Sequence, residues 1–519
     1  MVSSTITPSP RHTNALLLTS TFVIAVCGLV YELLAGTISS YLLGDSVYQF
    51  SIVIGIFMAA MGLGSFASRY VGTRLLEIFI VVQLFIALIG GSSALVLFHA
   101  FSVLDNYNIF LLLELVLIGA AVGLEIPLVI RILQDYQVLK VNVSNVLTVD
   151  YLGALIASVL FPLVLVPQLG LIRTSVLFGL LNATVAGMAI WIFRFEILKT
   201  RALTAGVIVC VAMLAGAFIQ ADRLLGYFES RLFAGEVIYA TTSPYQRIVV
   251  TRNTQTINLF INGALQFSSI DEYRYHESLV HPVMSLSRRR QEVLVLGGGD
   301  GLGVREVLKY QDVKRVTLVD LDPAITNLFR HNPLLTSLNA DALNDPRVDI
   351  VNEDAWRFLE ATERRFDVVI IDLPDPHNLS LSKLYSKNFY TLLSQHLNAD
   401  GLIVTQGTSP VFALEAFWSI VSTLRAVPSP TQIDEFLQVR PYHAYIPSFG
   451  EWGYIMAAPY LPAWDRIELS VPTRFLDANA LLGMDAFPRD IAAIEAQVNT
   501  IHTHVLPKYY EQGWARWYE

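Results

Sequence analysis

The chain begins with about 200 residues of long apolar runs and then changes to the shorter hydrophobic periods of a soluble protein. Seven runs are each long enough to cross about 30 Å of hydrocarbon as a helix. The first is too long for a cleaved signal peptide, and six more follow it. The pattern predicts an α-helical transmembrane bundle of about seven spans in residues 1–221, which are Leu16–Leu43, Val47–Ala67, Ile78–Phe101, Ile109–Ile132, Leu147–Val166, Ser175–Phe193 and Ala202–Gln220.

Polar residues within these runs are the candidates for function in the membrane. Glu32, Glu114 and Glu125 lie inside spans, where a carboxylate is costly and usually faces a cavity or a partner. A protonated or paired structural glutamate is the alternative interpretation, and for Glu125, near Arg131 at a span end, it stands level with function. Glu32, well inside the first span, is the better functional candidate. The spacing of small residues in the second span predicts close helix packing at Gly55, Ala59, Gly62 and Gly64.

Basic residues between the spans favour one orientation. Most of them fall on the side of the N-terminus, whereas Arg173 stands alone in a loop on the other side. The positive-inside rule then places the N-terminus in the cytoplasm. With seven spans, the soluble half would lie outside.

The soluble half opens, after a linker at 222–234, with a β-rich subdomain at 235–285. Residues Glu236–Thr242, Gln246–Arg252 and Thr256–Ile261 alternate or carry β-branched side chains, which predicts strands. Asn262-Gly263 is a strong hairpin signal. A polar segment with helical spacing follows from Asp271, which is placed to be the N-cap.

An α/β domain occupies residues 286–460. Short apolar runs alternate with helical segments, which predicts a doubly wound, Rossmann-like parallel sheet with right-handed crossovers. The tail, 461–519, is expected to be helical and to form a surface or an interface. The predicted strands of the sheet are Val293–Leu296, Val316–Val319, Val348–Val351, Val368–Ile371 and Leu402–Thr405.

The strongest motif of the α/β domain lies between its first strand and first helix. Five glycines and one acid fall between Gly297 and Gly303. Gly297, Gly299 and Gly301 let the backbone turn and approach a ligand, and the acid is Asp300. The next strand ends in Asp320 and Asp322, where a ribose would be held. The motif predicts a nucleotide site, although an ordinary tight turn is the alternative.

Acids gather at the carboxyl ends of the predicted strands, where ligands of such sheets bind. Few basic residues are interleaved with them, which favours a substrate with more than one positive charge. Asp372 and Asp375 lie three residues apart and could orient a primary amine and accept its proton. Two loop acids that cap backbone amides are the alternative. The full set is Asp300, Asp320, Asp322, Asp354, Asp372 and Asp375.

Composition excludes some functions. The net charge of -9 argues against a nucleic-acid partner, which would need a basic face. Only 15% of residues are charged, in line with a large membrane half. Cys27 and Cys210 both lie in apolar runs, so we expect free thiols with no disulfide or metal role.

From about Val237 to Ala458 the sequence resembles the spermidine synthases, which are polyamine aminopropyltransferases. The segment Asp271-Glu-Tyr-Arg-Tyr-His-Glu, the loop Gly297-Gly-Gly-Asp-Gly and the pair Asp372 and Asp375 carry the resemblance, in the family's order. The helical front half resembles that of membrane-integral bacterial members. The resemblance implies a membrane-anchored transferase of the cytoplasmic (inner) membrane that moves an aminopropyl group from decarboxylated S-adenosylmethionine to a diamine, most simply putrescine, and releases 5′-methylthioadenosine.

The resemblance also assigns roles to residues. It implies Asp372 and Tyr275 as catalytic residues, and His276, Asp300 and Asp375 as ligands of the amines. No metal is implied, a homodimer is expected, and membrane lipid is a partner of the bundle. The donor is implied to contact Gln246, Gly297, Gly299, Asp300, Gly301, Asp320, Asp354 and Ala355.

Some positions depart from the family pattern. Asp320 stands where the family has a glutamate, and Leu373-Pro374 replaces a small polar pair. Phe449 falls where many members have a tyrosine near the diamine. We further expect Asp300 to repel the carboxylate of ordinary S-adenosylmethionine unless a cation such as Arg305 screens it. The donor is made in the cytosol, so we expect a cytosolic catalytic domain despite the charge count.

Two other functions compete with aminopropyl transfer. An S-adenosylmethionine-dependent methyltransferase acting on a membrane-associated substrate would share the fold, but the acidic rim disfavours it. A polyamine transporter or sensor with a binding-only soluble domain would retain the rim without the reaction. The presence of Asp372, Asp375, Tyr275 and His276 argues against the latter.

Overall fold

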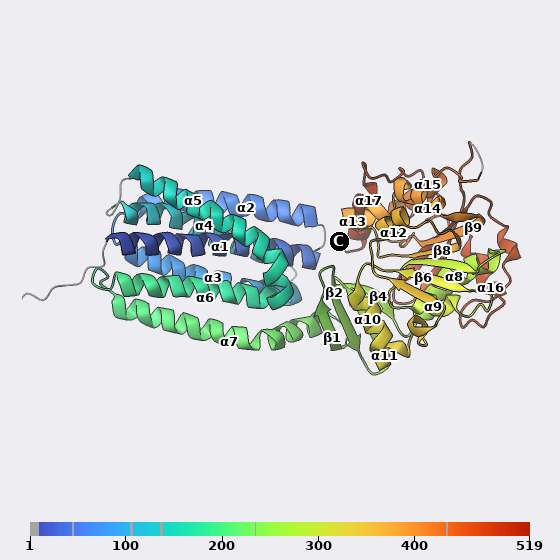
Figure 1. Ribbon diagram of the computed structural model, residues 1–519, viewed down its shortest axis with the longest axis horizontal. Coiled ribbons are helices and arrows are strands. Elements are labelled where there is room, and N and C mark those ends of the chain that lie inside the picture. Colours follow the sequence, from blue (N-terminus) through green and yellow to red (C-terminus); the bar gives the residue numbers. More distant parts are fainter. Residues whose placement is uncertain are drawn as a thin grey trace, which may run out of the picture. The chain divides into compact units, whose positions relative to one another are not determined.

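The computed structural model describes residues 10–43, 46–103, 107–134, 139–233, 235–431 and 434–518. The chain divides into two compact units, Met1–Val237 and Ile238–Glu519. Figure 1 shows the first as a helical bundle and the second as an α/β domain. Each unit is described separately below.

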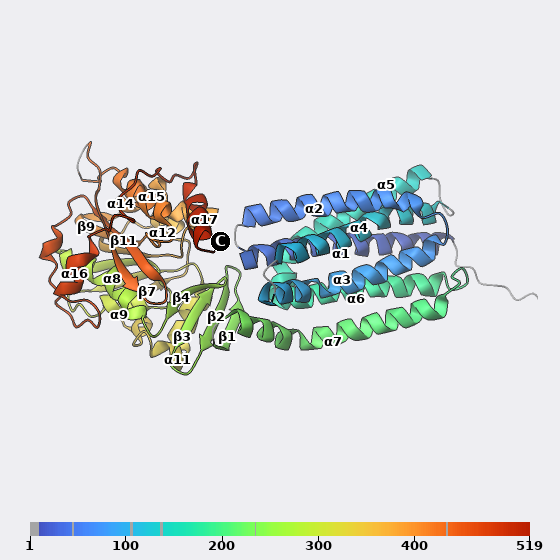
Figure 2. The same ribbon diagram turned by 180° about the vertical axis from the view of Figure 1, so that it is seen from behind.

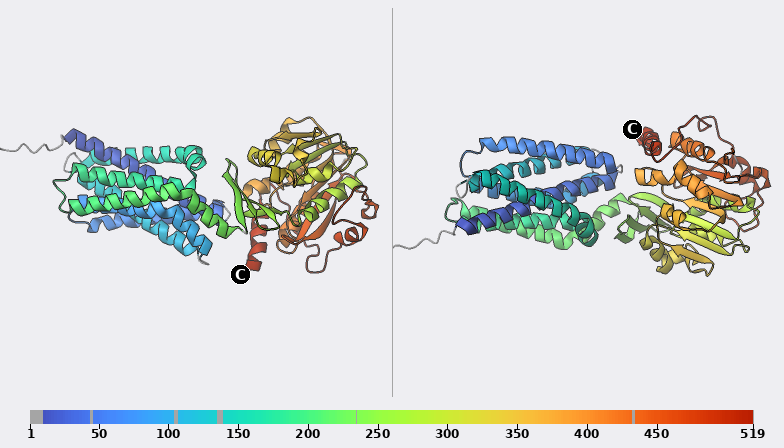
Figure 3. Two further views of the ribbon diagram at one scale, coloured as in Figure 1. Left: turned by 90° about the horizontal axis from the view of Figure 1, so that it is seen from below. Right: turned by 45° about the horizontal axis from the view of Figure 1, so that its top comes forward.

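Long helices make up the first unit, and each predicted span lies within or largely within one of them. Figure 3 shows these helices, blue to green, lying alongside one another. Large apolar side chains such as Met58, Leu155 and Ile219 are exposed on the outside of the bundle, as expected of a surface that faces lipid. The helices are α1 (Pro10–Leu43), α2 (Ser46–Ala67), α3 (Leu75–Val103), α4 (Tyr107–Leu133), α5 (Leu139–Leu160), α6 (Val166–Ile192) and α7 (Thr200–Leu232).

The number of spans differs from the predicted seven when helices are judged by length and hydropathy. Six helices of the described residues are long and apolar enough to cross a membrane, and one of them runs over Val143–Ile192. This one combines α5 and α6, which run in opposite directions in Figures 1 and 2. A π-helical turn, Phe161–Leu165, and Gly170, with φ 73° and ψ 174°, lie where the direction reverses. The count of membrane crossings stays a prediction.

Contacts inside the bundle correct two expectations. Of the predicted packing positions, Gly64 is in close contact, because a Cβ there would lie 1.9 Å from the carbonyl oxygen of Ala120, whereas Gly55 and Gly62 have open space around them. The buried Glu125 accepts a hydrogen bond from Gln83, with 2.5 Å between Nε2 and Oε1. The predicted partner, Arg131, donates to the carbonyl of Ser68 instead.

Two sheets form the second unit. The first has the order β1-β2-β3-β4, and its strands are β1 (Glu236–Thr242), β2 (Arg247–Arg252), β3 (Ile257–Ile261) and β4 (Ala264–Ser268). Asn262 and Gly263 join β3 to β4 with φ values of 49° and 84°, the conformation that the predicted hairpin turn requires.

The larger sheet has the order β10-β11-β9-β8-β5-β6-β7. The five strands that the sequence predicted are parallel, but β10 and β11 add an antiparallel hairpin at one edge. The sheet is therefore mixed and not purely parallel. Its strands are β5 (Glu292–Gly297), β6 (Arg315–Val319), β7 (Val348–Val351), β8 (Phe366–Asp372), β9 (Leu397–Gln406), β10 (Gln438–Ile446) and β11 (Gly450–Ala458).

Helices cover both faces of this sheet (Figure 1). Val293 and Val295 point into one hydrophobic core and Leu294 and Leu296 into the other, so β5 is buried on both sides. The helices of the unit are α8 (Glu272–Leu286), α9 (Leu302–Val307), α10 (Pro323–His331), α11 (Pro333–Thr336), α12 (Ala355–Ala361), α13 (Leu379–Leu384), α14 (Lys387–Ser394), α15 (Leu414–Arg425), α16 (Ala478–Met484) and α17 (Val505–Tyr518).

The C-terminal tail is more than a surface feature. Leu476, Leu481 and Met484 are buried in one core of the α/β domain, and Leu506 is buried in the other. Within the described part of the tail, residues 461–518, α16 and α17 are the α-helical segments and most of the rest is irregular. The expectation of a helical surface segment was therefore wrong in part.

Candidate active site

The site lies where the strand order changes direction, between β5 and β8. Chain order runs outward from β5 through β6 and β7 on one side and through β8 and β9 on the other. Ligands of doubly wound sheets bind at this point, beyond the carboxyl ends of the strands. The glycine turn and Asp372 meet there, since Gly297 pairs with Asp372 in the sheet.

The glycine turn is packed tightly against its neighbours. Gly297, Gly298 and Gly301 have φ values of 78°, 65° and 77°, which glycine adopts without strain. A Cβ at Gly297 would lie 2.2 Å from the carbonyl oxygen of Asp372, and one at Gly299 would lie 2.6 Å from Asp320 Oδ2. The sequence therefore needs glycine here for close approach as well as for turning.

Asp300 and Asp320 form the acidic side of this turn. The backbone N–H of Gly299 donates to Asp320 Oδ2 at 3.0 Å, and that of Leu302 donates to Asp300 Oδ1 at 2.9 Å. Burial raises the pKa of each carboxyl to about 6. Both acids are thus near their titration range at neutral pH, and a cation beside them would hold them ionised.

The other acids on the donor side are tied into secondary structure. Asp322 caps α10 and also accepts a 2.6 Å hydrogen bond from Ser243, in the turn that contains the partly buried Gln246. Asp354 caps α12 just before the buried Ala355 and lies 3.4 Å from Lys383 Nζ. Asp322 and Asp354 thus act as helix caps, a role considered from the sequence only for Asp372 and Asp375, whose carboxylates accept from side chains.

Asp372 and Tyr275 meet directly. The Tyr275 hydroxyl donates to Asp372 Oδ1 at 2.7 Å, although the two residues lie almost 100 positions apart. The Tyr275 ring packs against Phe449 and Tyr454, with centroid distances of 6.1 and 5.7 Å. Phe449 thus supports Tyr275 by packing. Burial raises the pKa of Asp372, while His276 and the Tyr275 hydroxyl oppose that shift.

His276 supplies a positive charge among these acids. Its Nδ1 lies 2.9 Å from Glu272 Oε2, and its Nε2 lies 4.0 Å from Asp372 Oδ2. Burial lowers the pKa of His276, but the hydrogen bond that its ring N–H donates to Glu272 and the charges of Glu272, Asp300 and Asp372 raise it to about 9. The imidazole is therefore protonated at neutral pH.

Arg305 forms an ion pair with Glu272, the carboxylate that binds His276. Its guanidinium donates to both carboxylate oxygens of Glu272, at 3.0 and 2.9 Å, and also to Glu306. These carboxylates engage Arg305, the cation that could have screened Asp300, so the repulsion expected between Asp300 and the carboxylate of ordinary S-adenosylmethionine stays a prediction. Sequence reasoning missed Glu272 and Arg305 as the pair that fixes the charge of His276, since their contact crosses from α8 to α9.

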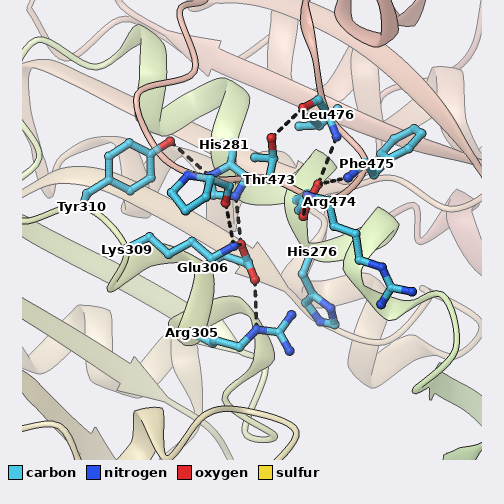
Figure 4. Close-up of polar contacts among 12 residues, drawn as sticks. His276, His281, Arg305, Glu306, Lys309, Tyr310, Thr473, Arg474, Phe475 and Leu476 are labelled. Atoms are coloured by element: carbon cyan, nitrogen blue, oxygen red, sulfur yellow. Dashed lines mark hydrogen bonds and ion pairs between the residues drawn. The ribbon is translucent and has the colours of Figure 1, made fainter.

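A second buried network lies behind His276 (Figure 4). Glu306 bonds His281 Nε2 at 2.9 Å and Lys309 Nζ at 2.5 Å. Burial alone would raise the pKa of Glu306, but these partners outweigh it and lower the pKa to about 2. Glu277, next to His276 in α8, accepts the backbone N–H groups of Arg474, Phe475 and Leu476 at 2.6 to 3.0 Å. The tail is thereby fastened to the helix that carries Tyr275 and His276.

Asp375 is surrounded by neutral donors that the sequence did not reveal. Gln406 Nε2 donates to Oδ1 and Thr408 Oγ1 donates to Oδ2, each at 3.2 Å. The hydroxyl of Tyr510, in α17, makes a third hydrogen bond. Burial raises the pKa of Asp375 to about 6 against these three bonds. No group of His, Cys, Asp and Glu in the described part of the chain is arranged to hold a metal ion.

Comparison with known proteins decides the family. Residues 272–459 match the Spermine/spermidine synthase domain. The chain is similar to polyamine aminopropyltransferase 2 of Ralstonia nicotianae, with 48% identity over 96% of this chain and 98% of the relative. It is also 43% identical to the polyamine aminopropyltransferase of Leptospira interrogans, again over 96% and 98%. The chain belongs to the spermidine synthase family.

Part of the chain is also similar to solved spermidine synthases. One, in complex with the transition state analogue AdoDATO, is 25% identical over 49% of this chain and 84% of its own, with a TM-score of 0.43. Membership of the family, which the relatives show, confirms the predicted enzyme class, an aminopropyltransferase, and the predicted co-substrate, decarboxylated S-adenosylmethionine. Aminopropyl transfer is therefore supported over the competing methyltransferase and sensor hypotheses.

The roles of single residues stay predictions. The structure does bring Tyr275, His276, Asp300, Asp320 and Asp372 together around the glycine turn. Gln406, Thr408 and Tyr510 are the site residues that the sequence did not indicate. Gln406 and Thr408 follow directly on the predicted end of β9, so the rule that ligands bind beyond strand ends could have found them.

Proposed function

We propose that this protein is a membrane-anchored aminopropyltransferase that converts putrescine to spermidine with decarboxylated S-adenosylmethionine. The observation that carries the proposal is the 2.7 Å hydrogen bond between Tyr275 and Asp372 at the carboxyl end of β8. It places a partly buried carboxylate, oriented by a hydroxyl, beside the glycine turn. A general base of this kind is what an alkylammonium acceptor needs before it can attack carbon.

In the proposed reaction, Asp372 takes a proton from the acceptor ammonium, and Tyr275 fixes the carboxylate during that transfer. The nitrogen lone pair then attacks the propyl carbon next to sulfur. The carbon–sulfur bond breaks, its electron pair returns to the sulfonium, and neutral 5′-methylthioadenosine leaves. The site contributes by aligning nitrogen, carbon and sulfur and by removing the proton.

The remaining roles follow from charge and position. Asp300, in the glycine turn, would hold the ammonium of the aminopropyl group, and Asp320 the ribose hydroxyls. Asp354 and Ala355 would border the adenine, and Gln246 the thioadenosine. Asp375 would hold the second ammonium of the acceptor. His276 is protonated, so we now assign it to keeping Asp372 ionised, and not to direct binding of a cationic amine.

The first test is a product assay on detergent-purified, full-length protein with putrescine. Decarboxylated and ordinary S-adenosylmethionine are supplied separately, with Asp372→Asn as the control. We expect spermidine and methylthioadenosine from the decarboxylated donor alone, with kcat lower by about 10²- to 10⁴-fold in the variant. Turnover with the ordinary donor only would refute the proposal. If the wild-type enzyme preferred another diamine, the proposed acceptor would be wrong, but the proposed reaction, aminopropyl transfer, would still hold.

The bundle gives the proposal its membrane part. Six apolar helices and an apolar outer surface support anchoring in the cytoplasmic membrane. Because the donor is made in the cytosol, we place the catalytic unit on the cytosolic side, and protease treatment of sealed inside-out vesicles should therefore degrade it. If the catalytic unit were protected in inside-out vesicles and cleaved in right-side-out vesicles, it would lie on the opposite side of the membrane. We also propose a homodimer, to be measured by light scattering in detergent.

A further inference from the structure

The carboxylate of Asp375 has nearly all of its hydrogen-bonding capacity filled. An ionised carboxylate offers about four acceptor positions. Gln406 and Thr408 donate to its two oxygens at 3.2 Å each, and the hydroxyl of Tyr510 donates as well. About one position is left free, which suits one N–H of a terminal ammonium.

Tyr510 comes from a part of the chain beyond residue 459, where the match to the family domain ends. Its ring packs against His377 and Trp514, with centroid distances of 6.3 and 5.9 Å. His377 follows Asp375 by two residues, so the ring lies against the same loop that carries the carboxylate. The helix α17 thus contributes both a hydroxyl and an aromatic wall to this end of the site.

The position of α17 is fixed by close backbone packing. A Cβ at Gly513 would lie 2.6 Å from the carbonyl oxygen of Phe412, so the helix backbone touches the segment before α15. Phe412 also stacks on Trp514 at 4.8 Å between centroids. Since Gly513 lies one turn from Tyr510, these contacts hold the tyrosine in place.

We propose that Tyr510 closes the acceptor subsite at Asp375 and thereby selects a short diamine whose second terminal ammonium ends there. This inference rests on the proposed function, because it takes Asp375 as the ligand of the acceptor. A longer polyamine would continue past the carboxylate into the stack of Tyr510, His377 and Trp514. Tyr510 is a specificity-determining residue in this view, supplied by the C-terminal helix to a site built by the family domain.

The test compares Tyr510→Phe with Tyr509→Phe in full-length protein. Tyr509 lies on the same helix and is also partly buried, so the control loses a hydroxyl from the same element. We expect Tyr510→Phe to raise the KM for putrescine about 10-fold, with kcat and the KM for the donor within about twofold. Loss of the hydrogen bond raises the pKa of Asp375, so the acid limb of putrescine binding should move to higher pH. Tyr509→Phe should change none of these.

A second variant, Tyr510→Ala, opens the wall. We expect it to raise the ratio of kcat/KM for spermidine over putrescine at least about 10-fold. An unchanged putrescine KM and an unchanged acid limb in Tyr510→Phe would overturn the inference, and so would a fall in kcat alone. Those results would leave the proposed function standing as long as the wild type makes spermidine. A wild type that neither binds nor converts any diamine would refute both.

Discussion

At the scale of single residues, the site is a set of carboxylates whose charge depends on their neighbours. Asp300, Asp320 and Asp375 have pKa values raised to about 6 by burial, whereas Glu306, with cationic partners, has one lowered to about 2. Asp300 and Asp375, which we expect to hold amines, thus keep raised pKa values, although the charge of His276 opposes the shift at Asp300. A dication entering the site would supply the missing charge.

Tyr275 should affect both the rate and its pH dependence. Its hydroxyl donates to Asp372 and lowers the pKa of that carboxyl. In Tyr275→Phe the pKa of Asp372 should rise, so the acid limb of kcat/KM should move to higher pH. We expect kcat to fall about 10- to 100-fold, as for the loss of a hydrogen bond to a charged group. Methylthioadenosine release measured across pH checks both effects.

The matched control is Tyr273→Phe on the same helix. The Tyr273 ring contacts the Arg474 guanidinium at 3.9 Å, and that contact survives the substitution. Equal losses in both variants, or a rate loss in Tyr275→Phe without any shift of the acid limb, would show that the hydroxyl acts through packing of α8 alone.

At the scale of elements, the glycine turn ties the end of β5 to the end of β8. We expect Gly297→Ala to destabilise the protein by at least about 3 kcal/mol, since the new Cβ meets the carbonyl oxygen of Asp372 at 2.2 Å in addition to the positive φ. Displacement of Asp372 should lower kcat at least about 100-fold in the protein that still folds. Thermal unfolding and product formation measure the two effects.

Gly263→Ala separates these causes. Gly263 has a similar φ of 84° but no atom within 4 Å of the position of a Cβ. We expect a cost of about 1 kcal/mol from the backbone alone, and unchanged kcat. If both variants lost the same stability and kept their activity, the contact between the turn and β8 would have no role in catalysis.

The fastening of the tail to α8 is open to a similar test. Glu277 accepts three backbone N–H groups from Arg474, Phe475 and Leu476. Glu277→Gln places an N–H₂ group against one or more of these donors, so we expect a loss of about 2 kcal/mol. Limited proteolysis should then cut near residue 474 at an increased rate. Glu292→Gln is a control, since its carboxylate pairs with Arg364 at 3.0 Å, and neither residue belongs to the tail. Unchanged proteolysis in Glu277→Gln would mean that hydrophobic packing alone holds the tail.

The elements also show how far the sequence could lead. The five parallel strands were predictable because each is an apolar run buried on both faces. The hairpin of β10 and β11 was missed, and Pro441, Arg440 and His443 break the alternation of β10. Tyr275 and Asp372 both stand in recognisable motifs. The ion pair of Arg305 with Glu272, and the contact of Tyr510 with Asp375, depend on how distant elements pack, which no local pattern encodes.

At the scale of the whole molecule, one chain combines an apolar bundle with an α/β enzyme domain that is rich in buried charge. The apolar runs of the bundle were evident from hydropathy, but Gly170 and the π-helical turn before it join two predicted spans in one segment, Val143–Ile192. Gly170 lies between the fifth and sixth predicted spans, and its positive φ interrupts the helix there. Sequence alone places the glycine but does not give its φ.

The charges of the catalytic unit predict how the stability of the protein depends on pH. The raised pKa values of Asp300, Asp320 and Asp375, about 6 against an ordinary 3.8, mean that the folded state binds more protons than the unfolded state between about pH 4 and 6. For His276, with a pKa of about 9 against 6.5, the same holds between about pH 6.5 and 9. Stability from these groups therefore falls as pH rises through both windows.

We expect the unfolding temperature of the full-length protein in detergent to fall from pH 6.5 to 9, with a loss of a few kcal/mol attributable to His276. His276→Gln should flatten this window and leave the slope below pH 6 in place. Asp375→Asn should reduce only the slope of the lower window, because Asp300 and Asp320 also contribute to it. Putrescine binds the ionised acids, so its stabilising effect should be larger at pH 8 than at pH 5. A wild-type slope unchanged by His276→Gln would show that the imidazole is neutral, and would remove the charge that we assign to keeping Asp372 ionised.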